Sequence, residues 1–351
     1  MCSALPTMLR SSLLSLSVAL SFTIGCGPST REAEAGATRE ASSSGEISST
    51  STCARVERAT ETVTARNTFG TLEGTLEVPE GCAGMPVVLI LSGSGSQDRD
   101  GNSPRIYALL AEGLRDAGIA ALRFDDPGVD ASHTALPDKI EEFVYETEVD
   151  AMGAWLDVLA SDRRFGPIVL AGHSQGSLTA LLLAQRGSVD AVVSLAGTGR
   201  PIAEVLREQL VSRLTAEQLA TFDATLEKVA RGEIVDPVPP PLDRIMPPSV
   251  QPYFASWMKY DPKIEIAKLA QPVLIVQGGT DVQVSDVDAA RLAEGNPEAQ
   301  MLHIPDMCHV LREAHQKTAS SQAAQYSEPA IPLHASLLPR LAQFVNGLEK
   351  P

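Results

Sequence analysis

The sequence predicts an α/β fold in which a doubly wound, mostly parallel sheet carries a helical cap insertion. Short apolar runs, rich in leucine and β-branched residues, are typical of strands buried on both faces: 87–91, 119–124, 168–171, 191–195 and 272–277. Helical patterns separate these runs, an alternation that favours parallel strands joined by helices. A further stretch of about 70 residues has no strand pattern, which is too long for an ordinary connection.

The remaining elements follow from local signals. Residues 61–67 and 71–78 alternate apolar and polar side chains around Phe69-Gly70, which predicts an antiparallel hairpin. Ser103-Pro104 predicts the start of a helix and Gly118 its end. Apolar periodicity predicts further helices at 148–159, 178–185 and 333–348 and a strand at 301–304. A capping box from Ser285 to Asp288 predicts the start of one more helix.

The stretch without a strand pattern runs from Arg200 to about Lys268. It contains two helical patterns, 202–214 and 216–230, followed by a proline cluster. We expect a cap at about 200–268 over one end of the sheet; an excursion away from any site is the alternative. Four residues are expected to line an apolar acyl pocket, or else to pack the cap on the core: Tyr253, Phe254, Trp257 and Met258.

Composition limits the possible partners. The chain has 351 residues, enough for one large domain or two small ones, and 44 acidic against 28 basic residues give a net charge of −16. Such a surface repels phosphate backbones, and 4% aromatic residues are too few for base stacking, so nucleic acid is excluded. No apolar run reaches the roughly 20 residues that a transmembrane helix needs.

The N-terminus has the pattern of an export signal. Arg10 precedes an uncharged run, 11–24, and then small residues, which predicts a signal peptide over 1–26. Thr23-Ile24-Gly25-Cys26 resembles the bacterial lipobox, which implies a lipid on Cys26; plain secretion and a buried helix are the alternatives. Residues 27–55 are small and polar and are predicted to form a flexible linker, leaving 56–351 as the folded domain.

Three cysteines fall beyond the signal segment. Cys53 and Cys82 flank the predicted hairpin, and an oxidising compartment would permit a disulfide between them. Cys308 would then be a lone thiol, which is more often a small buried side chain than a nucleophile.

The strongest chemical signal is Gly172-His173-Ser174-Gln175-Gly176, which fits G-x-S-x-G. It follows one predicted strand directly and opens a predicted helix, the context in which a sharp turn exposes a nucleophilic serine. Both glycines then have a reason, because strand and helix approach too closely for side chains. We predict that Ser174 is the nucleophile; a tight turn with a surface serine is the alternative.

A serine nucleophile needs a base and an acid that orients the base, in the chain order Ser, Asp, His. Asp281 follows a predicted strand and is expected to be the acid, while the rival Asp286 belongs to the capping box. His309 follows the last predicted strand and is expected to be the base. His173 is expected to face away from the site, and His303 to pack in the core. No catalytic part is expected for His133, His173, His303, His315 or His334.

An oxyanion needs backbone N–H donors. The residue after the nucleophile, Gln175, is expected to supply one, and Ser94 in the glycine-rich loop 92–101 the other. This loop lacks the lysine of a phosphate-binding loop and carries Asp98 and Asp100, so a phosphate site is not expected. A calcium site is not expected either, because its glycine is misplaced.

Four segments together resemble the α/β-hydrolase family, near the bacterial branch of serine aminopeptidase-like and EstD-type esterases, over residues 79–348: SGSGSQDRDG at 92–101, GHSQGS at 172–177, GGTD at 278–281 and CHVL at 308–311. Ser92 stands where that branch usually has histidine, and Asp126 opens a segment where it has Arg-Gly-x-Gly-x-Ser. The resemblance implies hydrolysis of carboxylic esters, often with short acyl chains, and peptidase and thioesterase relatives.

The sequence therefore predicts a serine hydrolase of small-molecule esters with short to medium acyl chains, needing no cofactor and no metal. An aminopeptidase, amidase or thioesterase with the same triad is one alternative, in which Asp98, Asp100 or a carboxylate of the cap would bind a free amine. A binding lipoprotein of the cell envelope without catalysis is the other. We expect contact with a membrane only through a lipid on Cys26.

Overall fold

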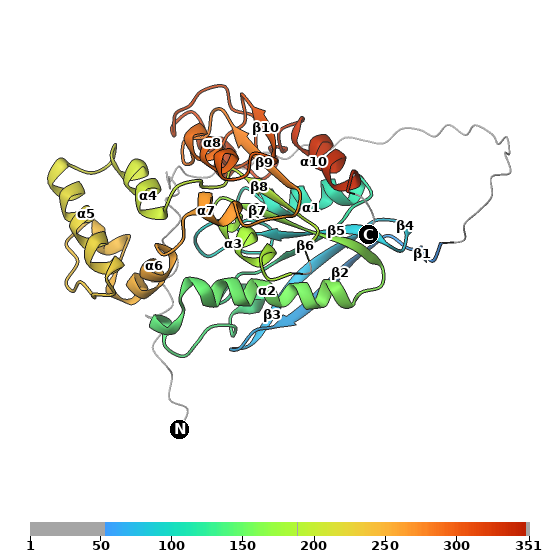
Figure 1. The fold of residues 1–351 in the computed structure, drawn as a ribbon, viewed down its shortest axis with the longest axis horizontal. Helices are drawn as coiled ribbons and strands as arrows, with labels where there is room; N and C mark the ends of the chain where they lie inside the picture. Colours follow the sequence, from blue (N-terminus) through green and yellow to red (C-terminus); the bar gives the residue numbers. More distant parts are fainter. Residues whose placement is uncertain (1–52, 188, 349–351) are drawn as a thin grey trace, which may run out of the picture.

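The core of the fold is an eight-stranded sheet, seen in a computed structural model that describes residues 53–187 and 189–348 (Figure 1). The strand order is β10-β9-β8-β7-β5-β6-β3-β2. The strands from β10 to β6 are parallel, and β3 and β2 add an antiparallel hairpin at one edge, as predicted. Their bounds are Ala59–Arg66 (β2), Thr71–Val78 (β3), Met85–Leu91 (β5), Ala120–Phe124 (β6), Phe165–His173 (β7), Ala191–Leu195 (β8), Val273–Gly278 (β9) and Gln300–Ile304 (β10).

Both faces of this sheet are covered by helices. Val87, Leu89 and Leu91 of β5 belong to the core on one side, with side chains of α2, α3 and α8. Val88 and Ile90 belong to the core on the other side, with side chains of α1 and α10. The two sets alternate because successive side chains of a strand point to opposite faces. The helices are α1 (Ile106–Asp116), α2 (Tyr145–Ser161), α3 (Gln175–Ala184), α8 (Asp286–Gly295), α9 (Ala323–Ser327) and α10 (Leu337–Asn346).

The start of α1 differs from the prediction. The helix begins at Ile106, after Arg105 with a φ of 52°, and Ser103-Pro104 lies in the preceding turn. The carboxylate of Asp98 accepts the backbone N–H of Asn102 at 2.8 Å, and the carbonyl oxygen of Asn102 accepts the backbone N–H of Arg105 at 3.0 Å, so a turn spans the proline before the helix begins. The capping box that opens α8, by contrast, is formed as predicted.

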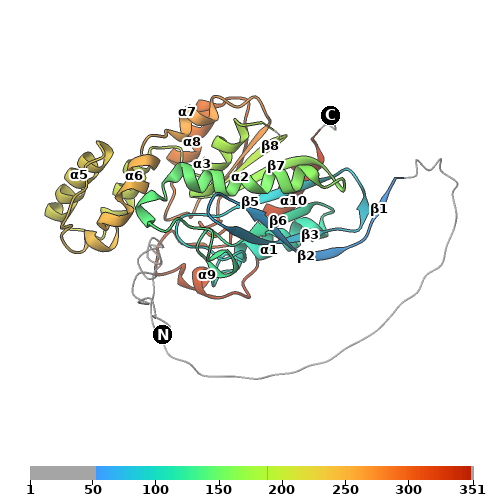
Figure 2. The ribbon, with the colours of Figure 1, turned by 90° about the horizontal axis from the view of Figure 1, so that it is seen from below.

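The predicted insertion is helical. No strand lies between β8 and β9 in the described residues, and the chain forms α4 (Ile202–Leu210), α5 (Ala216–Ala230), α6 (Gln251–Trp257) and α7 (Pro262–Ile266). Helices α4, α5 and α6 lie beyond one end of the sheet (Figures 1 and 2). Helix α6 packs against both α5 and α2, so it attaches this cap to the body.

Cys53 and Cys82 form a disulfide with a Cα–Cα distance of 5.6 Å, which confirms the predicted pair. The bridge spans 29 positions and encloses the β2–β3 hairpin. Beside it, β1 (Arg55–Val56) and β4 (Gly81–Cys82) pair as a separate two-stranded sheet. Cys308 is a buried free thiol.

Replacing both bridged cysteines (Cys53→Ala with Cys82→Ala) is expected to lower the free energy of unfolding by about 3 kcal/mol, because the unfolded chain regains the entropy of an open loop. Urea denaturation followed by circular dichroism measures this loss. Reductant added to the wild type is the matched control and should lower the urea midpoint equally. An unchanged midpoint in both experiments would contradict a stabilising bridge.

Residues 1–52 lie outside the described part of the chain, and with them the predicted signal peptide, Cys26 and most of the predicted linker. Among the residues that the structure describes, no helix combines the length and the apolar character needed to cross a bilayer.

Candidate active site

Ser174 lies at the turn between β7 and α3, with φ 54° and ψ −118°. A residue other than glycine is strained in this conformation. A Cβ atom at Gly172 would lie 2.1 Å from the carbonyl oxygen of Gly176, and one at Gly176 would lie 2.4 Å from that of Ser92. Strand and helix therefore approach too closely for any side chain at either glycine, as the motif predicts.

Asp281 and His309 meet at the carboxyl ends of β9 and β10. The Nδ1 atom of His309 lies 2.8 Å from Oδ2 of Asp281, and both residues are buried. Oδ1 of the same carboxylate accepts the backbone N–H groups of Gln283 and Val284 at 2.7 and 2.9 Å. A carboxylate held in this way places the proton of the neutral imidazole on Nδ1 and leaves Nε2 able to accept a proton.

Ser174 and His309 line one cavity of about 420 Å³ between the sheet and the cap. No hydrogen bond joins Ser174 Oγ to His309 in the described residues, a bond that is often long before substrate binds. Of the four cap residues predicted to line an acyl pocket, Trp257 lines this cavity, Tyr253 and Phe254 line a second one, and Met258 packs against the core. The cap also contributes Ile202, Val205, Leu206 and Ile245.

Both predicted oxyanion donors lie at this cavity. The backbone N–H groups of Ser94 and Gln175 donate to no protein acceptor in the described part of the chain. The N–H of Gly93 is engaged, because it donates to the Tyr107 hydroxyl at 2.7 Å. Ser94 and Gln175 are therefore the amides available to a developing negative charge.

Comparison with known proteins identifies the family of this chain. Residues 87–320, more than half of the chain, match the model of the alpha/beta hydrolase family. The chain belongs to this family. It is 27% identical over 252 residues to esterase EstD of Thermotoga maritima, a match that covers 70% of this chain and 59% of that protein. The chain thus spans about three fifths of the length of this curated relative.

Two solved structures share the fold of this alpha/beta hydrolase. An esterase of Pyrococcus furiosus superposes with a TM-score of 0.53 at 14% identity, covering 83% of this chain and 91% of that one. The 2,6-dihydroxy-pseudo-oxynicotine hydrolase superposes with a TM-score of 0.52 at 16% identity, covering 84% and 69%. At these identities the likeness concerns the fold.

In this alpha/beta hydrolase, His173 contacts the site, whereas the sequence placed its side chain elsewhere. Its Nε2 lies 2.8 Å from the carbonyl oxygen of His309, and its Nδ1 lies 3.1 Å from the Tyr107 hydroxyl. A carbonyl only accepts, so Nε2 carries the proton and Nδ1 accepts from Tyr107. Burial and the nearby His309 lower the pKa of His173 to about 3, which keeps the ring neutral. The Tyr107 hydroxyl in turn accepts the backbone N–H of Gly93. His173 therefore links the backbone of His309, through Tyr107, to the glycine-rich loop.

The two departures from the family pattern contact each other. The Ser92 hydroxyl donates to Oδ1 of Asp126 at 2.6 Å, and Oδ2 of Asp126 accepts the backbone N–H of Gln97 at 2.9 Å. Ser92 and Asp126 are both buried. The pair therefore fixes the glycine-rich loop.

Asp98 and Asp100, which the aminopeptidase alternative offers as amine-binding carboxylates, make contacts within and beside the glycine-rich loop. Asp98 accepts the backbone N–H groups of Asp100 and Asn102, and Asp100 pairs with Arg123 at 3.0 Å. Both carboxylates are thus engaged in holding the loop.

The remaining histidines lie apart from the cavity. His303 is exposed and contacts Asp286 at 3.1 Å, so its predicted place in the core is wrong, because β10 is an edge strand. His315 lies in a loop, 3.0 Å from Glu313. With Asp306 these two residues form the one group of possible metal ligands found among the described residues, and exposed acidic groups of this kind are common without an ion.

Proposed function

We propose that this alpha/beta hydrolase cleaves carboxylic esters, with Ser174 as nucleophile, His309 as general base and Asp281 as the residue that orients it. The observation that carries the proposal is the buried 2.8 Å contact between His309 and Asp281 at the cavity that Ser174 lines. The similarity to a protein named esterase supports the ester as the substrate class.

In the first step, Ser174 Oγ bonds to the ester carbonyl carbon while its proton passes to Nε2 of His309. The electron pair of the carbonyl moves to its oxygen, which accepts the backbone N–H groups of Ser94 and Gln175. Collapse of this intermediate breaks the bond to the alkoxy oxygen, which takes the proton from Nε2 and leaves as the alcohol. Asp281 stabilises the imidazolium that exists between the two transfers.

The second step reverses these roles. Water gives a proton to Nε2 of His309 and adds through its oxygen to the acyl carbon, and the oxyanion returns to the same two amides. Ser174 Oγ leaves, regains the proton from Nε2, and the carboxylic acid is released. Apolar cap residues around the cavity, Ile202, Val205 and Leu206, favour short to medium acyl chains.

Fluorophosphonate labelling, with the modified residue located by mass spectrometry, tests the nucleophile, and p-nitrophenyl esters from acetate to laurate test the reaction. We expect label on Ser174 and turnover that peaks at short or medium acyl chains. Thioesters and aminoacyl anilides measured in parallel separate the thioesterase and amidase alternatives. A folded protein that neither labels nor hydrolyses any of these substrates would leave the binding lipoprotein as the better description.

We also propose that the protein is exported and anchored by a lipid on Cys26. The signal-like residues 1–26 support this, and so does the Cys53–Cys82 disulfide, because such bridges persist in oxidising compartments. In a bacterial host, Cys26→Ala is expected to move the protein from the membrane to the soluble fraction and to abolish labelling by radioactive palmitate. The Cys308→Ala variant is the control and should stay with the membrane. Equal fractionation of both variants would exclude this anchor.

A further inference from the structure

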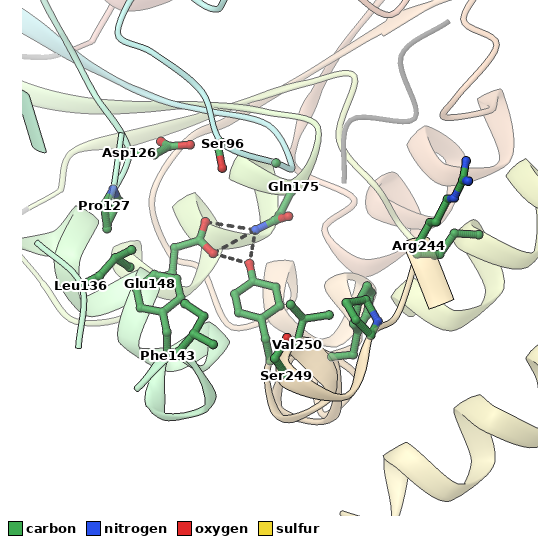
Figure 3. Close-up of a pocket in the computed structure, with 16 residues that line it drawn as sticks. Ser96, Asp126, Pro127, Leu136, Phe143, Glu148, Gln175, Arg244, Ser249 and Val250 are labelled. Atoms are coloured by element: carbon green, nitrogen blue, oxygen red, sulfur yellow. Dashed lines mark hydrogen bonds between the residues drawn. The ribbon is translucent and has the colours of Figure 1, made fainter. Parts of the chain in front are cut away.

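A second cavity lies beside the first and ends on a carboxylate that the proposed mechanism does not use. It has a volume of about 90 Å³, room for a group of roughly three to five non-hydrogen atoms. Its walls are mostly apolar and come from the body and from the cap. They include Pro127, Leu136, Ile140, Phe143, Val250 and Phe254 (Figure 3).

The two cavities meet at Gln175. This residue lines both, as does Ile245, and the loop that carries Ser94 continues into Gly95 of the second cavity. The backbone N–H of Gln175 is a proposed oxyanion donor, while its side chain extends into the second cavity (Figure 3). The second cavity therefore adjoins the cavity that Ser174 lines.

Glu148 of α2 provides the carboxylate. Its oxygens accept hydrogen bonds from Nε2 of Gln175 at 3.0 and 3.2 Å and from the hydroxyl of Tyr253 (Figure 3). The Gln175 amide also donates to the Tyr253 oxygen at 2.5 Å. Glu148 is the acceptor in each hydrogen bond that it makes here, which suits an ionised carboxylate. Its donors, the Gln175 amide and the Tyr253 hydroxyl, are neutral and bring no positive charge to it.

No cation compensates this carboxylate in the described residues. Glu148 forms no ion pair there, and neither does the buried Asp126 at the same cavity. Arg244 also lines the cavity, but it lies at the right of the view with its guanidinium group directed away from Glu148 (Figure 3). Burial without a cation raises the pKa of Glu148 to about 7.

We propose that this second cavity binds the ammonium group of a cationic ester, so that the enzyme prefers substrates with a short, positively charged substituent. An ammonium group would supply the missing positive charge at Glu148. The rings of Phe143 and Tyr253, nearly parallel with centroids 6.2 Å apart, present aromatic surface that attracts such a cation. This inference rests on the proposed ester hydrolysis and narrows its substrate class.

The test compares esters that differ only in charge. Choline esters, and esters with a trimethylammonium group at the end of a short acyl chain, are each paired with the isostere that carries a tert-butyl group. For at least one pair we expect kcat/KM of the charged ester to exceed that of the neutral one about tenfold in the wild type. Equal values in both pairs would overturn the proposal.

The Glu148→Gln variant is expected to remove this charge preference. Asp150→Asn is the matched control, because Asp150 lies exposed on the same helix and its replacement removes the same charge. The control should keep the ratio of kcat/KM between charged and neutral esters. If Glu148→Gln lowers kcat/KM equally for the charged and the neutral ester, the ratio is unchanged. Glu148 then only holds Gln175 in place, and the proposal fails.

The preference is also expected to weaken as the pH falls through about 7, since protonation removes the charge of Glu148. The other titratable groups that face this carboxyl are Tyr253 from α6, Tyr145 from α2 and Asp126 from the loop after β6. The pKa values of both tyrosines are raised well above the ordinary value by burial, so they stay neutral here. A charge preference that persists undiminished well below pH 7 would contradict the role of Glu148.

Binding can be measured without turnover. Titration calorimetry of choline and of its tert-butyl isostere on the Ser174→Ala protein is expected to show tighter binding of choline, and loss of this difference when Glu148→Gln is added. This result would stand even if no ester were hydrolysed, so failure of the proposed reaction and failure of the cation site are distinguishable. Equal affinities of choline and the isostere would overturn the cation site.

Discussion

Ser174→Ala is expected to lower kcat for p-nitrophenyl esters by about 10⁶-fold, since the covalent step loses its nucleophile and only binding and the oxyanion donors remain. The side chain of Ser174 makes no hydrogen bond in the described residues, so its removal should change the free energy of unfolding little. Alanine keeps the strained backbone that Gly172 and Gly176 impose. Initial rates and fluorophosphonate labelling measure the loss, and thermal unfolding verifies the fold.

Ser161→Ala is a suitable control for this experiment. Ser161 ends α2 and is exposed, and its hydroxyl donates to the carbonyl oxygen of Val158, the one hydrogen bond of this side chain within the described residues. This variant should hydrolyse esters and label like the wild type. Turnover that persists in Ser174→Ala at wild-type level would remove Ser174 from the mechanism and would also remove the proposed triad.

Asp281→Asn is expected to lower kcat by about 10⁴-fold while the fold persists. In the native site, one oxygen accepts two backbone N–H groups, from Gln283 and Val284, and the other accepts the Nδ1 proton of His309. An asparagine side chain has one oxygen, which accepts the two backbone N–H groups. Its NH₂ group then faces Nδ1 and donates to it, which places the imidazole proton on Nε2, where it cannot accept from Ser174.

Asp286→Asn is the matched control for this variant. Asp286 is the next carboxylate that could compete for the role, and it is exposed beside His303. Its replacement should leave kcat unchanged. If Asp281→Asn kept the wild-type kcat, or if Asp286→Asn lowered kcat, the assignment of the acid would be wrong. Thermal unfolding of both variants distinguishes lost catalysis from lost structure.

Local patterns were sufficient for the framework. The apolar runs identified the strands because each run is buried on both faces, and G-x-S-x-G identified the elbow because a Cβ at Gly172 or Gly176 would collide with backbone atoms. Chain order identified Asp281 and His309, which follow neighbouring parallel strands whose carboxyl ends lie at one edge.

Predictions failed where a contact outside the local pattern decided the outcome. Ser103-Pro104 has a strong signal for a helix start, but the Asp98 carboxylate binds Asn102, which closes a turn with Arg105 before the helix begins at Ile106. His303 lies in a strand with apolar neighbours, yet that strand is at the edge of the sheet, so one of its sides meets solvent. Neither the reach of a side chain nor the position of a strand in the sheet is written in a local pattern.

The sequence by itself determined the class of fold, the strained serine and the two residues that the structure brings together beside it, because each depends on short-range sterics or on chain order. Only the tertiary structure decided what surrounds them. His173 and His309 are 136 positions apart, and Glu148 and Tyr253 are 105 apart. The first contact depends on how the strands are arranged in the sheet, and the second on how α6 of the cap packs against α2. The contact of His173 with the candidate base and the place of Glu148 at the second cavity therefore became visible only in three dimensions.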